Sequence, residues 1–189
     1  RLYTYADKQG SPEAHKWLQE IARAFDRAGA ENTARTSYLG AMAKYKLNQA
    51  IYDEFATIQL RQPLKQSLGR KKVAMQKALD AYLLSYKLCD STKNDFLKAE
   101  AAGFVAQLYL ELNNFIQAEK YALAANQISL QLQQHKVVAS TYNVLKQIAV
   151  NKNDYKKALK FAEEQKSEEQ AMFVCGRLIE FNEQFEDYQ

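Results

Sequence analysis

Apolar residues recur three and four positions apart along most of the chain, which is the period of an amphipathic α-helix. A first helix is expected to begin at Ser11 and Pro12, because serine caps free helical amides and proline fits the first helical position. Gly29 is placed to close this helix. The same period predicts further helices over about 31–45, 94–112, 115–132, 135–151 and 154–165, and a last helix over about 167–183.

Residues 49–88 divide less regularly. Ile51 and Phe55 predict one helix, which Pro63 ends because proline lacks a backbone donor. A long helix then runs over 64–88. No low-complexity linker interrupts the chain, so we expect one continuous domain over residues 1–189. Its helix pairs are expected at about 11–46, 49–88, 94–132 and 135–165, followed by a C-terminal capping helix at 167–183.

Composition supports a folded all-α chain. Of the 189 residues 47% are hydrophobic, which supplies a core of useful size. Six glycines and two prolines are too few for a turn-rich β fold, and they count against a glycine-rich phosphate loop. No apolar run reaches the roughly 20 residues of a membrane span. Because the chain opens at Arg1 without Met, we expect a fragment of a longer or processed protein.

Small and aromatic residues repeat at a spacing of forty. Ala118 and Ala122 are followed forty residues later by Ala158 and Ala162. In the same register the turn sequences are Asn113-Asn114-Phe115 and Asn153-Asp154-Tyr155. Forty residues before Ala118, Ala122 and Ala125 stand Ala78, Tyr82 and Ser85, so the long helix over 64–88 is interpreted as an extended second helix of a pair. Matching offsets upstream hold Phe25, Gly29, Ala34, Tyr38 and Ala41.

These residues resemble the tetratricopeptide repeat, in which small side chains let two antiparallel helices pack closely and aromatic residues fill the gaps between pairs. The resemblance implies a right-handed solenoid of long, forty-residue repeats. Lys146 and Gln165 stand where the repeat usually has small residues, and an unrelated antiparallel bundle is the alternative fold. Long repeats of this kind are similar to those of bacterial peptide-sensing regulators, sensor-kinase input domains and kinesin-light-chain-like adaptors.

The resemblance also implies that the first helix of each pair lines a concave groove, which binds a peptide or a partner helix. A solvated helix face without a ligand is the alternative. The groove lacks the Lys/Asn clamp for a chaperone's terminal carboxylate, because Gly103 and Gln107 stand at the clamp positions. The expected groove residues are Lys16, Arg23, Arg27, Gln107, Glu111, Asn143, Gln147 and Asn151.

The net charge of +4 is small, so only the local distribution of charge is informative. Residues 61–77 contain six basic side chains and no acidic one, and Arg61, Lys65 and Lys72 form a basic stripe near one helical face. Such a stripe is usually a solvated surface, although an acidic protein, nucleic acid or lipid headgroups are alternative partners. The acidic residues of 167–189 and the apolar face of the terminal helix provide a candidate homodimer contact.

Residues with catalytic or metal-binding chemistry are sparse. His15 and His135 have no Cys or carboxylate at metal-ligand spacing, and Cys89 and Cys175 are interpreted as small packed residues. We therefore expect no metal, no cofactor and no enzymatic activity. His135 is expected to be exposed and solvated.

The expected function is that of a non-catalytic scaffold or adaptor that binds a protein or peptide. The first alternative is a peptide- or ligand-sensing regulatory domain of a signalling protein. A helical enzyme and a nucleic-acid binder that uses residues 61–77 are further alternatives, although the mild net charge does not favour nucleic acid. Cytoplasmic and bacterial periplasmic locations both remain open.

Overall fold

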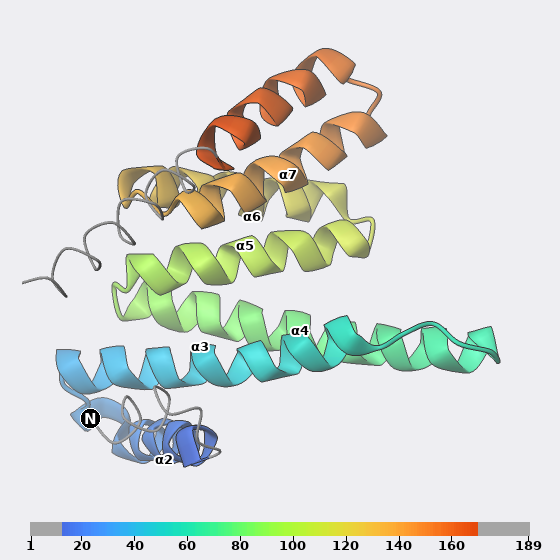
Figure 1. The fold of residues 1–189 in the computed structure, drawn as a ribbon. Coiled ribbons are helices and arrows are strands. Elements are labelled where there is room, and N and C mark those ends of the chain that lie inside the picture. Colours follow the sequence, from blue (N-terminus) through green and yellow to red (C-terminus); the bar gives the residue numbers. More distant parts are fainter. Residues whose placement is uncertain (1–12, 170–189) are drawn as a thin grey trace, which may run out of the picture. The chain divides into compact units, whose positions relative to one another are not determined.

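The computed structural model describes residues 13–169, and all regular structure within them is helical (Figure 1). The chain divides into two compact units, residues 1–104 (unit 1) and 105–189 (unit 2). The expected cap at Ser11, Cys175 and most of the expected capping helix at 167–183 lie outside the described residues. The helices are α2 (Glu13–Ala28), η1 (Gly29–Glu31), α3 (Ala34–Thr57), α4 (Leu64–Ser91), α5 (Asp95–Glu111), α6 (Phe115–Gln131), α7 (His135–Asn151) and a last helix over residues 155–169.

Four turns of one form connect the helices from α4 onward. Lys93, Asn113, Gln133 and Asn153 have positive φ of 54–57°, and they are spaced by twenty residues. At each turn the next residue donates its backbone N–H across the helix end, as Asn114 does to Tyr109 O at 2.9 Å. This is the Schellman ending, which satisfies the last free carbonyls of a helix. The expected helices over 94–112, 115–132 and 135–151 are confirmed because each turn stops one helix and starts another.

In unit 1, α2 packs on α3 through a close crossing. Leu18 and Ala22 form a cluster with Ala43, and Gly40 lies so close to Phe25 that no side chain fits at this glycine. The spacing of Ala34, Tyr38 and Ala41 predicts that all three face inward, and for Ala34 and Tyr38 this prediction is wrong: Ala34 is exposed and Tyr38 is 49% exposed, whereas Ala41 is fully buried. The crossing is centred on Gly40 and Ala43, nearer to the middle of α3 than the repeat register placed it.

The expected break between residues 46 and 49 is also wrong, because α3 is one helix of 24 residues. No glycine or proline stands between Ala41 and Thr57 to interrupt it. Asn48 sits mid-helix without breaking it, since its amide donates to Ala81 O and Ser85 Oγ on α4, both at 2.8 Å. A single helix therefore stands between α2 and α4, where the sequence predicted two.

Aromatic rings fill the core of unit 1 between α3, α4 and α5. Tyr82 is fully buried and stacks on Phe104, with ring centroids 4.6 Å apart. Tyr45 and Tyr52 meet Tyr82 edge-on at 6.0 and 6.2 Å. Ala78, Tyr82 and Ser85 are all buried, which confirms that this face of α4 takes part in helix packing. Phe96 is 53% exposed and does not belong to this core.

In unit 2, small residues on α6 allow close packing. Ala118, Ala122 and Ala125 have no exposed surface, and Ala158 on the last helix is 7% exposed. Ala118 and Ala122 share one cluster with Ala106 of α5 and with Val144, Leu145 and Ile148 of α7. The buried faces expected from the forty-residue spacing are therefore present. The expected break near residue 166 is absent, since residues 155–169 are continuously helical.

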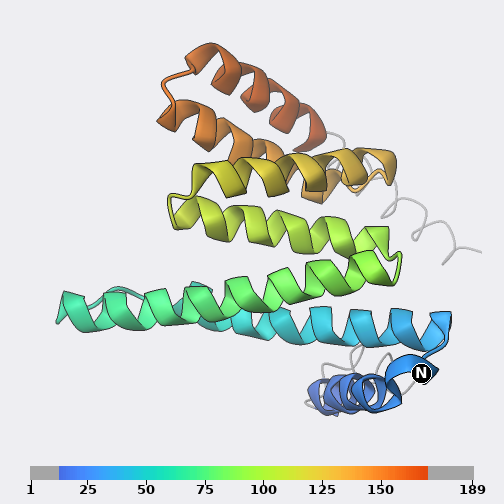
Figure 2. The ribbon, with the colours of Figure 1, turned by 180° about the vertical axis from the view of Figure 1, so that it is seen from behind.

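The α3–α4 hairpin is the longest feature of unit 1. α4 has 28 residues and α3 has 24, compared with 16 in α2. At 1.5 Å per residue the difference between α4 and α2 is about 18 Å. Both views show the closed end of the hairpin extending well beyond α2 (Figure 1, Figure 2).

Candidate functional site

The strongest candidate for a binding face in unit 2 consists of polar side chains at equivalent positions of α5 and α7. Gln107 and Gln147 are forty residues apart, and so are Glu111 and Asn151. Ala106 of α5 belongs to the same core cluster as Val144, Leu145 and Ile148 of α7. The structure therefore brings together five of the eight expected groove residues on two neighbouring helices: Gln107, Glu111, Asn143, Gln147 and Asn151.

These side chains remain available to a ligand to different degrees. Glu111, Gln147 and Asn151 are exposed, whereas Gln107 and Asn143 are half-buried. The Asn151 side-chain amide donates to the backbone O of Gln147 at 2.9 Å, so one of its two N–H donors is already used. Neutral amides both donate and accept, which suits them to the backbone of an extended peptide.

The other three expected groove residues, Lys16, Arg23 and Arg27, lie exposed on α2 in unit 1. Arg23 pairs with Glu20 at 2.8 Å, and the Arg27 Nε donates to Arg23 O at 3.4 Å. In the expected pairs, α5 and α7 are first helices and α4 and α6 are second helices. The same alternation makes α3 a first helix and α2 a second helix. The α2 residues therefore do not occupy positions equivalent to Gln107 and Gln147.

The basic stripe lies at the closed end of the α3–α4 hairpin. Arg61 stands in the connection between the helices, and Lys65 and Lys72 lie seven residues apart on α4, hence on one face. All three are exposed. An open hollow of about 360 Å³ lies beside them, lined by Arg61 and Arg70 together with the chain at Thr57–Gln59.

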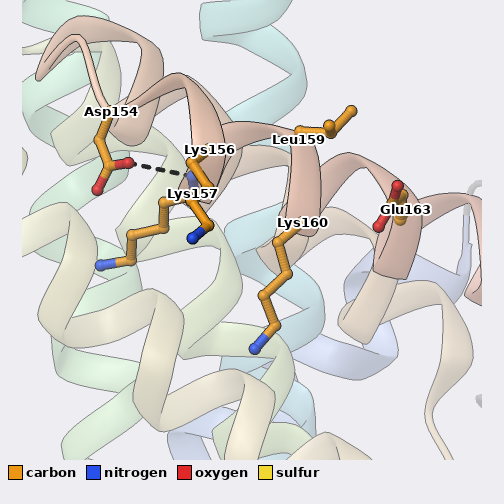
Figure 3. A pocket seen from close by; sticks show the side chains of 6 residues that line it. All are labelled: Asp154, Lys156, Lys157, Leu159, Lys160 and Glu163. Atoms are coloured by element: carbon orange, nitrogen blue, oxygen red, sulfur yellow. Dashed lines mark hydrogen bonds between the residues drawn. The ribbon is translucent and has the colours of Figure 1, made fainter.

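A second group of basic residues surrounds the start of the last helix, and sequence reasoning missed it. Lys156, Lys157 and Lys160 line an open hollow of about 480 Å³ together with Asp154, Leu159 and Glu163. Figure 3 shows Lys157 and Lys160 extending to one side of the helix and Leu159 pointing away from them. The Asp154 carboxylate accepts from the Lys157 backbone N–H at 3.1 Å and so caps the helix. The run Lys156-Lys157 followed by Lys160 was the available sequence signal.

Part of this basic charge is neutralised within the fold. Glu119 on α6 accepts from Lys152 at 2.6 Å and from Lys157 at 3.5 Å. The hydrogen bond from Lys152 lowers the pKa of the Glu119 carboxyl, and this effect exceeds the opposing effect of partial burial. Lys152 and Lys157 therefore connect α6 to the turn after α7 and to the first turn of the last helix.

His135 has a partner that the sequence did not predict. Its Nδ1 lies 2.7 Å from Glu168 Oε2, and both side chains are partly buried. The pair connects the first residue of α7 to the last described turn of the chain, which explains why His135 is not solvated as expected. In residues 13–169 no group of three or more His, Cys, Asp or Glu side chains is arranged to hold a metal ion.

The buried titratable groups of unit 1 belong to its core. Burial raises the pKa of the Cys89 thiol to about 11, with a smaller contribution from Glu100. Burial also raises the pKa of Tyr82 above its ordinary range, and among the described residues its hydroxyl has no hydrogen-bond partner. Both groups are therefore kept neutral and unreactive at physiological pH.

The sequence matches no known protein family, and no curated protein is similar to it at a significant level. Within residues 13–169, every helix is too short or too polar to cross a lipid bilayer.

Proposed function

We propose that this chain is a protein-interaction module of tetratricopeptide-like helix pairs, which binds an extended peptide segment across α5 and α7. The observation that supports this most strongly is the repetition of both backbone and side chains. Turns of one form recur every twenty residues, and they leave Gln107 and Gln147 at equivalent positions of neighbouring helices.

The spacing of these amides suits an extended chain. Helices that pack directly lie about 8–10 Å apart, and an extended peptide advances about 3.3 Å per residue. Roughly three residues of a bound peptide therefore separate the contact with Gln107 from the contact with Gln147. Only Glu111 among the five side chains carries a charge, so backbone hydrogen bonding is expected to dominate recognition.

The test is selection of binding peptides from a random twelve-residue library on the intact chain, followed by fluorescence polarisation with the selected peptides. We expect the variant Gln107→Ala/Gln147→Ala to bind about tenfold more weakly, because each lost hydrogen bond contributes about 0.5–1.5 kcal/mol. The matched control is Gln127→Ala/Gln131→Ala, which removes two exposed glutamines from α6 in the same unit.

Equal weakening in both variants would mean that these glutamines act through stability or general polarity. Equal binding by both variants and the wild type would place the peptide elsewhere, and either result contradicts the proposal. Circular dichroism of each variant establishes that the helices are retained.

A further inference from the structure

We propose that the closed end of the α3–α4 hairpin is a docking surface for an anionic lipid membrane. We name this end the basic tip and define it as residues 58–73. The proposal does not depend on peptide binding by unit 2, because every residue of the basic tip belongs to unit 1.

The basic tip projects with little cover from the rest of its unit. Of the α4 residues 64–73, only Ser67 is buried, whereas the second half of α4 carries the core residues Ala78, Leu79 and Tyr82. Both views show this end of the hairpin extending away from α2 (Figure 1, Figure 2). A projecting end of this kind can meet a flat surface such as a membrane.

The connection at the basic tip is held in one arrangement by Ser67. Its hydroxyl lies 2.7 Å from Arg61 O and accepts from Arg61 N–H at 3.2 Å. The Gln62 side chain accepts from Leu64 N–H at 3.3 Å and caps the start of α4. The side chains around this connection are therefore displayed by an ordered backbone.

The exposed side chains of the basic tip combine apolar and cationic character. Leu60, Leu64 and Leu68 are 50%, 51% and 41% exposed. On α4, Leu64 and Leu68 share a face at a spacing of four, and Lys65 and Lys72 lie directly beside them. Such a face inserts aliphatic groups at the boundary between headgroups and acyl chains while cations contact lipid phosphates.

The charge of the basic tip is unbalanced. Lys71 lies over the Phe55 ring at 5.3 Å, and beyond the tip Lys77 pairs with Glu54 at 3.4 Å. The exposed cations Arg61, Lys65, Arg70 and Lys72 have no carboxylate within ion-pair distance among the described residues, and no acidic residue occurs between 59 and 79. An anionic surface complements this charge.

The exposed leucines favour lipid over nucleic acid. Phosphate contacts alone would account for the cations, but three half-exposed leucines add nothing to the recognition of a phosphate backbone. They gain free energy when an apolar environment removes them from water, and the acyl region of a bilayer provides one. Lipid binding therefore accounts for both the leucines and the cations of the basic tip.

The experiment is co-sedimentation of the full chain with vesicles of phosphatidylcholine alone or with 30% phosphatidylserine. We expect binding only to the anionic vesicles, with affinity falling as salt rises. Lys65→Glu/Lys72→Glu should weaken binding at least about thirtyfold, and Leu64→Ser/Leu68→Ser at least about tenfold. The matched control Lys156→Glu/Lys160→Glu makes the same charge change in unit 2 and should bind within about twofold of the wild type.

Absence of binding to anionic vesicles at low salt would overturn the proposal. So would equal weakening by the control pair, because attraction would then follow net charge. Binding to duplex DNA that is tighter than vesicle binding and insensitive to the leucine change would assign the basic tip to nucleic acid. Helical content and melting temperature of each variant distinguish loss of docking from loss of folding.

Discussion

Two glycines in unit 1 allow the same substitution to be tested in opposite environments. A Cβ added at Gly40 would lie 2.3 Å from Cγ and 2.7 Å from Cβ of Phe25. A Cβ added at Gly69 meets nothing within 4 Å. Both glycines are inside helices, so alanine gains about 1 kcal/mol of helix propensity at each position.

The helix-propensity gain is common to both sites, so the difference between the substitutions isolates the clash. Rotation of the Phe25 ring cannot relieve it, because the Cβ of Phe25 is itself too close. Overpacking of this kind costs about 1–3 kcal/mol. We expect Gly69→Ala to stabilise unit 1 by about 0.5–1 kcal/mol and Gly40→Ala to destabilise it by up to about 2 kcal/mol, the clash less the gain in helix propensity.

The assay is urea unfolding followed by circular dichroism and by fluorescence of Trp17, the only tryptophan, which lies half-buried on α2. A double-mutant cycle with Phe25→Ala provides the decisive comparison. In that background Gly40→Ala has no ring to meet and should become neutral or stabilising. If Gly40→Ala destabilises the chain equally with and without Phe25, the close crossing of α2 and α3 does not account for the glycine.

Three other predictions follow from local chemistry. Gln133→Gly should raise the free energy of unfolding by about 0.5–1 kcal/mol, because glycine adopts the positive φ of 54° without strain, and a decrease in urea resistance would contradict this. Lys152 lowers the pKa of Glu119 in the folded chain, so this stabilisation is complete above the unfolded value near 4.5 and is lost as pH falls through the lower folded value. Acid titration of stability should therefore show a steeper decline in the wild type than in Glu119→Gln, and parallel curves would refute the pairing. Burial holds the pKa of Cys89 near 11, so in a Cys175→Ser background a thiol reagent at pH 8 should label Cys89 only on unfolding, and rapid labelling of the folded chain would be contrary evidence.

The regular half of the fold could be predicted from the sequence because its signals are local. The turns at residues 113 and 153 contain asparagine, which tolerates positive φ, followed by a residue that caps the next helix. Alanines at a fixed spacing then identified the packed faces of α6 and the last helix. Each signal involves residues within one or two turns of helix, so a single sequence is enough to recognise it.

The first half could not be predicted in the same way, because tertiary contacts decide it. Asn48 sits within α3 without ending it, since α4 supplies partners for its amide. The crossing at Gly40 depends on Phe25, which belongs to another helix. The predicted break at residues 46–49 was wrong for a related reason, because contacts with α4 keep α3 one helix. One helix in place of two changes which helices come first and second in each pair, so α2 takes the place of a second helix, and the groove stays a prediction.

In the turn after α5, one residue both ends a helix and begins the next. The backbone N–H of Asn114 closes α5, and its carbonyl and side chain open α6 by accepting from Ala118 and Gln117. A residue inserted there would separate the end of one helix from the start of the next and rotate the downstream helix by about 100°. In the 58–63 connection, which Ser67 holds through Arg61, different residues end α3 (Ile58) and precede α4 (Pro63). Residues can therefore be inserted at that connection without rotating the helices of the later turns about their axes. New surfaces are most readily acquired in evolution at the end of the α3–α4 hairpin.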